Sequence, residues 1–77
     1  MKEIIKSEEL NLLMYKILTD REQDVFKELS KGTTNNDIAK TLFISVNTVK
    51  THLKNIYGKL NVKNRTQAVK KVNNMEN

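Results

Sequence analysis

The apolar residues of this 77-residue chain recur at helical spacing along most of its length. Proline is absent and glycine occurs only twice, so nothing favours a hairpin-rich sheet protein. We therefore expect an all-α protein that forms one compact four-helix domain. The pattern places its helices at about Asp20–Lys31, Asn35–Leu42, Val46–Leu60 and Arg65–Asn74.

Residues 1–17 are compatible with two structures. Ser7 is suited to cap a short helix, whose apolar positions would be Leu10, Leu13, Met14 and Ile17. The same segment also fits a frayed N-terminal arm or the remnant of a linker from a larger protein. We accordingly divide the chain into an arm or short helix over 1–17, the helical domain over 18–74 and a tail over 75–77.

Each predicted helix of the domain follows a residue suited to N-capping. Thr19 precedes the first helix, and Glu22 three residues later completes a capping box. Gly32 follows that helix, where a left-handed cap is expected. The remaining three helices follow Thr34, Ser45 and Asn64.

Residues 34–60 predict a helix-turn-helix. An eight-residue helix is followed by a three-residue connection, Phe43-Ile44-Ser45, and then by a longer helix. Ala39 is small enough to let the two helices approach closely. The longer helix has an apolar inner face formed by Val49, Leu53, Ile56 and Leu60. Gly58 within this helix costs about 1 kcal/mol relative to alanine, and the pattern does not explain it.

The charge is distributed unevenly. The formal net charge of +5 is divided as 0 over residues 1–17, −1 over 18–45, +7 over 46–72 and −1 over 73–77. The segment 46–72 holds seven Lys or Arg residues and no acid. This segregation predicts an anionic partner, and it favours nucleic acid over a membrane surface.

The outward face of the third helix carries side chains that can read DNA bases. Lys donates to guanine O6 and N7, Asn pairs with adenine N6 and N7, and the methyl group of Thr packs on that of thymine. The candidates lie in the N-terminal part of the helix, where a recognition helix meets base edges. They are Asn47, Lys50, Thr51 and Lys54. The alternative is an ordinary solvated helix face.

Phosphate contacts are expected at helix N-termini, where free N–H groups and the helix dipole favour anions. Such contacts fix the register on DNA without specifying sequence. The candidates are Thr34, Asn35, Thr48, Lys63, Asn64, Arg65 and Thr66. Plain helix capping is the alternative role for Thr34 and Asn64.

Other function classes find little support. Cysteine is absent, which removes disulfides and thiolate metal sites, and His52 is the only histidine. We expect His52 to be packed or to face phosphate, and Phe43 and Tyr57 to pack rather than stack on bases. We predict no metal, cofactor or small-molecule ligand, no membrane association and no enzymatic activity. A cytoplasmic location is the default expectation, because no signal peptide or membrane span is recognisable.

Several runs of residues together resemble the LuxR-type (NarL/FixJ) DNA-binding domain. They are Leu-Thr-Asp-Arg-Glu at 18–22, Asn-Asp-Ile-Ala at 36–39, Leu-Phe-Ile-Ser-Val-Asn-Thr-Val-Lys-Thr-His at 42–52, Lys-Leu at 59–60 and Asn-Arg-Thr-Gln-Ala at 64–68. The resemblance implies a bacterial transcriptional regulator that binds promoter DNA as a dimer on two half-sites, with helix 46–60 in the major groove. It also implies that Lys50, Thr51 and Lys54 meet bases and that Val69 and Val72 pair two subunits.

A receiver or signal-binding domain does not fit within residues 1–17. The resemblance therefore indicates either a stand-alone, GerE-like member or a fragment of a larger regulator, and RNA polymerase is a further candidate partner. One rival prediction is a domain like region 4 of sigma factors, which shares the Leu-Thr-x-Arg-Glu opening but not the Thr-Val-Lys-x-His run. Another is a helix-turn-helix adaptor that contacts only protein, and an enzyme is the weakest alternative.

Overall fold

The computed structural model describes residues 15–76, and side chains as far as residue 73. Within these residues the chain is all α-helical, which confirms the expected four-helix fold. The helices are α2 (Asp20–Leu29), α3 (Asn35–Leu42), α4 (Val46–Leu60) and α5 (Arg65–Glu76). Most of the segment 1–17, where we expected an arm or short helix, lies outside the described residues.

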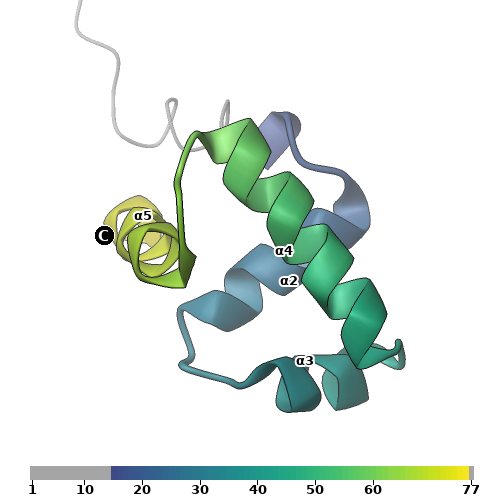
Figure 1. Ribbon diagram of the computed structural model, residues 1–77. Coiled ribbons are helices and arrows are strands. Elements are labelled where there is room, and N and C mark those ends of the chain that lie inside the picture. The colour runs from purple at the N-terminus through teal and green to yellow at the C-terminus, as the bar shows by residue number, and fades with distance from the viewer. Residues whose placement is uncertain (1–14, 77) are drawn as a thin grey trace, which may run out of the picture.

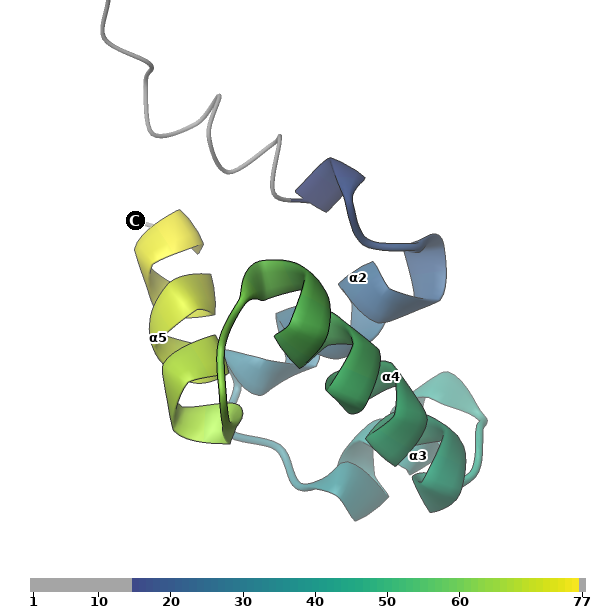
Figure 2. The ribbon, with the colours of Figure 1, turned by 45° about the horizontal axis from the view of Figure 1, so that its top comes forward.

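Helix α4 runs across the front of the domain and crosses α2 (Figure 1). Helices α2 and α3 both pack against α4, and α5 packs against α2 and α4. A second view shows α5 along one side of the domain, with its start close to the loop that leads from α2 into α3 (Figure 2). The starts of α3 and α5 therefore lie on the same side of the molecule, although 30 residues separate them.

The predicted capping box opens α2. The Thr19 hydroxyl accepts a hydrogen bond from the Glu22 N–H at 3.1 Å, and the Glu22 carboxylate accepts one from the Thr19 N–H at 3.0 Å. The helix ends at Leu29, two residues before the expected Lys31. Gly32 has a φ of +72°, the left-handed conformation expected there.

The turn of the helix-turn-helix is made by a phenylalanine in a glycine-like conformation. Phe43 has a φ of +58°, and its N–H donates to the carbonyls at the end of α3. The Ile44 N–H donates to the Ala39 carbonyl at 3.0 Å, which closes the helix. Asn61 ends α4 in the same way, with a φ of +57°. A phenylalanine therefore takes a backbone conformation that is strained for a bulky residue.

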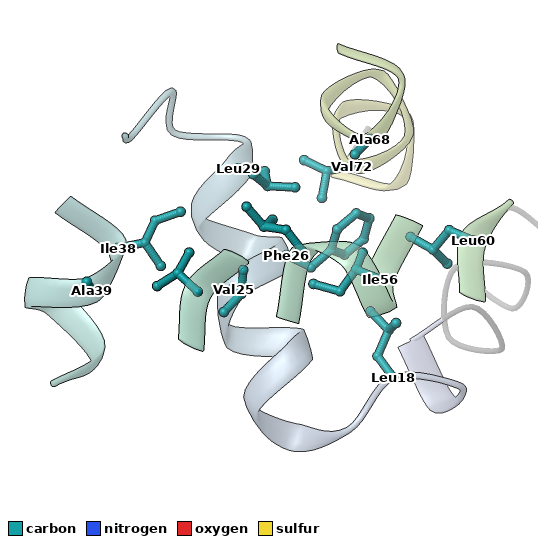
Figure 3. Close-up of a cluster of buried hydrophobic side chains, with 12 residues drawn as sticks. Leu18, Val25, Phe26, Leu29, Ile38, Ala39, Ile56, Leu60, Ala68 and Val72 are labelled. Carbon is teal, nitrogen blue, oxygen red and sulfur yellow. The ribbon is translucent and has the colours of Figure 1, made fainter. Parts of the chain in front are cut away.

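The hydrophobic core gathers around Phe26 and Ile56, both fully buried between α2 and α4 (Figure 3). Helix α3 contributes Ile38 and Ala39, and α5 contributes Ala68 and Val72. Tyr15 packs edge-on against Phe26, with ring centroids 5.8 Å apart. The core holds the four helices in one unit, so the groups on its surface are placed on a fixed scaffold.

A salt bridge on one side of the core joins α2 to the end of α4. The Lys59 ammonium lies 2.7 Å from the Glu22 carboxylate, whose side chain is only 5% exposed. Burial raises the pKa of Glu22, but hydrogen bonds from Lys59 and Thr19 and the charges of Lys59 and His52 outweigh this and hold its pKa below 4.5.

Among the described residues, no helix is both long enough and apolar enough to cross a membrane.

Candidate nucleic-acid interface

Helix α4 has one buried and one exposed face. The Ser45 hydroxyl caps it by accepting a hydrogen bond from the Thr48 N–H at 3.0 Å. The buried residues are Val49, Leu53, Ile56 and Leu60, as the apolar spacing predicted. The opposite face is exposed and consists of Asn47, Lys50, Thr51, Lys54 and Asn55. The four candidate base-contacting side chains are therefore accessible, while their contacts with bases stay a prediction.

The Thr51 hydroxyl is already engaged within α4. It donates to the Asn47 carbonyl one turn earlier at 3.1 Å. With its hydrogen used inside the helix, Thr51 can meet DNA only through its methyl group or through its oxygen as an acceptor. This fits the methyl contact with thymine that the sequence suggested.

A groove of about 460 Å³ lies beside α4 and brings together residues from three parts of the chain. It is lined by Asn35, Lys50, Leu53, Lys54, Tyr57 and Lys63. Two of these residues were expected at bases and two at phosphates. The fold thus assembles both predicted kinds of contact around one concave surface, which we call the basic groove.

The basic groove carries positive charge that no acid of residues 15–73 neutralises. Lys50, Lys54 and Lys63 are exposed, and none of them pairs with a carboxylate within residues 15–73. The ion pairs in this part of the chain are Arg21–Asp24, Lys31–Glu28 and Lys59–Glu22. An uncompensated cluster of three ammonium groups attracts a polyanion, and it repels cations and basic surfaces.

Tyr57 is a further groove residue, and the sequence did not place it at the site. It does pack against the core, as expected, but its half-buried side chain also lines the basic groove. Burial raises the pKa of its hydroxyl, and this outweighs the charge of Arg65, which lowers it. The hydroxyl is therefore neutral at pH 7 and can donate a hydrogen bond. The sequence did contain a signal for this position, because Lys50, Lys54 and Tyr57 follow one another at helical spacings of four and three and so share one face of the helix.

Two of the candidate phosphate contacts are helix caps. The Thr34 hydroxyl accepts from the Asp37 N–H at 3.2 Å, at the start of α3. The Asn64 side chain accepts from the Gln67 N–H at 2.9 Å, at the start of α5. Gln67 in turn accepts from the Lys63 N–H at 2.7 Å. Capping occupies the Thr34 and Asn64 acceptors, and both residues remain exposed to a ligand.

Arg65 is tied to the start of α3. Its Nη1 donates to the Asn35 side-chain oxygen at 2.8 Å, and its Nη2 donates to the Thr33 carbonyl. Thr48 also has a partner nearby, since its hydroxyl lies 2.8 Å from that of Ser45. By contrast, Thr66 is exposed at the start of α5.

Two expectations need correction. Val72, expected to pair subunits, is fully buried against the core, so its side chain is unavailable to a second copy, whereas Val69 is only half-buried. Phe43, expected to pack, is 93% exposed. Val72 was misplaced because the apolar spacing of α5 does not distinguish the face that meets the core from the edge beside it. Phe43 was misplaced because its left-handed backbone directs the ring into solvent.

His52 is half-buried and contributes to the lowered pKa of Glu22, and it is not among the residues that line the basic groove. Among the residues that the structure describes, no three His, Asp or Glu side chains are grouped so as to hold a metal ion. The accessible chemistry is that of a basic, hydrogen-bonding surface.

Comparison with known proteins supports this interpretation. Residues 16–72 match the family described as bacterial regulatory proteins of the luxR family. The CsgBAC operon transcriptional regulatory protein of Escherichia coli is 58% identical over 53 residues, 69% of this chain and 24% of that protein. The response regulator protein VraR of Staphylococcus aureus is 46% identical over 56 residues, 73% of this chain and 27% of VraR.

The chain spans about a quarter of the length of these curated relatives. The family match nevertheless covers most of the chain and every residue that lines the basic groove. Helix-turn-helix domains of this family bind DNA and are not enzymes. The chain therefore belongs to the LuxR family of bacterial regulatory proteins, and its four helices form the family's helix-turn-helix DNA-binding domain.

Proposed function

We propose that this domain binds double-stranded DNA sequence-specifically, with α4 in the major groove, and that it acts in transcriptional regulation. The observation that carries the proposal is the basic groove. Three lysines without acid partners line it within the described part of the chain, beside a helix face that is exposed along its N-terminal half. A helix of this kind fits the width of the major groove.

In this proposal the exposed face of α4 reads bases. Lys50 and Lys54 donate to guanine, Asn47 pairs with adenine, and Thr51 presents its methyl group to thymine. The backbone of DNA is held from two sides by helix N-termini and their flanking side chains. Those groups are Thr34, Asn35, Lys63, Asn64 and Thr66 around the neighbouring starts of α3 and α5, and Thr48 at the start of α4.

We further propose that two copies bind together on two half-sites of a promoter. Val69 is the half-buried apolar residue available on the outer side of α5, and its neighbours Thr66, Lys70 and Asn73 are exposed. A small apolar patch with a polar rim suits pairing that forms on DNA rather than in free solution. The cytoplasm is the compartment in which such a regulator meets DNA and RNA polymerase.

The test is selection from a pool of random-sequence DNA duplexes, followed by methylation interference on the enriched site. We expect one enriched motif, and we expect methylation of guanine N7 in the major groove to block binding. Recovery of no motif, or interference only from adenine N3 in the minor groove, would contradict the proposal. The spacing of repeated motifs then reports the geometry of the pair, at about one helical turn or a multiple of it.

Val69→Asp tests the pairing separately. The charged side chain would lie at the proposed interface, so the variant is expected to bind a single half-site normally and to lose cooperative binding to two half-sites. Lys70→Asp is the matched control, because it places the same acid one position along α5. Equal loss of cooperativity in both variants would show that the interface is not centred on Val69.

A further inference from the structure

Arg65 joins the starts of two helices. It is the first residue of α5, and Asn35, which accepts its hydrogen bond, is the first residue of α3. Its second contact is with the backbone carbonyl of Thr33, just before the cap of α3. Both contacts are partly buried. Figure 2 shows the start of α5 beside the loop that leads into α3.

This link borders the basic groove. Asn35 lies on the α3 side of the groove, and Lys63 lies two residues before Arg65 on the α5 side. Helices α3 and α5 otherwise pack mainly against α2 and α4 rather than against each other. Arg65 therefore adds a direct hydrogen-bonded link between the two sides of the groove.

We propose that Arg65 is a positioning residue, which holds Asn35 and Lys63 at the spacing that suits the DNA backbone and does not itself bind phosphate. This inference rests on the proposed function, and it revises the phosphate contact that the sequence suggested for Arg65. A guanidinium presents its donors in a planar fork, and both observed contacts use the two ends of that fork. Binding groups fixed in advance lose less entropy when DNA arrives.

The conservative variant separates positioning from charge. Arg65→Lys keeps the positive charge but has no planar fork, so it cannot make both contacts with the start of α3. We therefore expect it to weaken DNA binding about tenfold. If Arg65 binds phosphate directly, lysine should largely replace it, and affinity within about twofold of wild type would overturn the inference. Glu22→Gln is the stability control, because it weakens a contact outside the groove and should leave affinity unchanged.

A double-variant cycle tests whether Arg65 acts through Asn35. Asn35→Ala is expected to weaken binding about fivefold in the wild type, and less than twofold when Arg65→Lys is already present. Fully additive losses would mean that the two residues meet DNA independently, which overturns the inference. Wild-type protein that binds no duplex would refute the proposed function itself, so the two failures are distinguishable.

A measurement on the wild type avoids any effect of substitution on folding. Nuclear magnetic resonance reports whether the Arg65 guanidinium rotates slowly, as it does when both of its ends are hydrogen-bonded. We expect slow rotation in the free protein and no further slowing on addition of DNA. Rotation that becomes slow only in the complex would show that DNA, rather than α3, holds the group, and would overturn the inference.

Discussion

Two lysines of α4 that are five residues apart have opposite surroundings. Lys59 donates to Glu22 at 2.7 Å, in a contact that joins α4 to α2. Lys54 lines the basic groove and has no carboxylate partner among the residues that the structure describes. The first charge is neutralised by a carboxylate of the protein itself, and the second remains available to an external anion. A basic helix is therefore divided into a part that stabilises the fold and a part that, in the proposed function, binds DNA.

The largest effect is expected in the basic groove. Lys54→Glu should weaken binding to the selected duplex about 100-fold, because it replaces a base donor with an acid that repels phosphate. The helical circular dichroism signal should not change, since Lys54 is exposed. Lys27→Glu on α2 is the matched control for net charge, and gel-shift titrations that show equal losses for both variants would contradict a specific role for Lys54.

The next effect is on stability rather than binding. Glu22→Gln should lower the free energy of unfolding by about 1–2 kcal/mol, because the buried carboxylate loses its charge-assisted partners. The loss is moderate because the Lys59 side chain is 37% exposed, so water already screens the pair. Urea denaturation measures the change. An unaltered midpoint would mean that the contact does not hold α2 to α4.

Gly58 lies on α4 between Lys54, which lines the basic groove, and Lys59, which pairs with Glu22. A Cβ at this position would meet no other atom within 4 Å, so Gly58→Ala should raise stability by about 1 kcal/mol. Thermal unfolding measures the gain. If the DNA-binding surface ends at Tyr57, affinity stays unchanged. A loss of affinity in a more stable protein would instead extend the DNA-binding surface across Gly58 and would explain why the glycine is there.

The smallest effect concerns pH. The pKa of Glu22 lies below 4.5 in the folded protein, so the folded state binds this proton less readily than the unfolded state does. The resulting stabilisation is present above pH 4.5 and is lost as the pH falls through the lower, folded pKa. Unfolding temperatures should therefore decline at acid pH, and Glu22→Gln should lack that component. An identical decline in the variant would assign it to other carboxyl groups.

The features that local sequence determines were predictable. The caps at Thr19, Thr34 and Ser45 form as expected because each depends on residues three positions away. The inner face of α4 follows in the same way from a spacing that repeats along one helix. Helix α5 runs on to Glu76, beyond the expected Asn74, because neither glycine nor proline stops it.

The features that the sequence did not reveal depend on distant parts of the chain. The Lys59–Glu22 pair spans 37 residues, and the Arg65–Asn35 contact spans 30. The burial of Val72 likewise follows from how α5 lies on α2, which apolar spacing alone does not give. Residue types could place the candidate site on α4, but only the folded chain shows which lysines remain without an acid partner in the described region.

The salt dependence of DNA binding tests the central claim most directly. Each phosphate neutralised by a lysine adds about 0.9 to the slope of log affinity against log salt concentration. Lys63→Gln and Lys59→Gln each remove one positive charge, one from the basic groove and one from the internal pair. We predict that Lys63→Gln lowers the slope by about 0.9 and that Lys59→Gln leaves it unchanged. Equal reductions in both variants would contradict the claim, because net charge alone would then account for the binding.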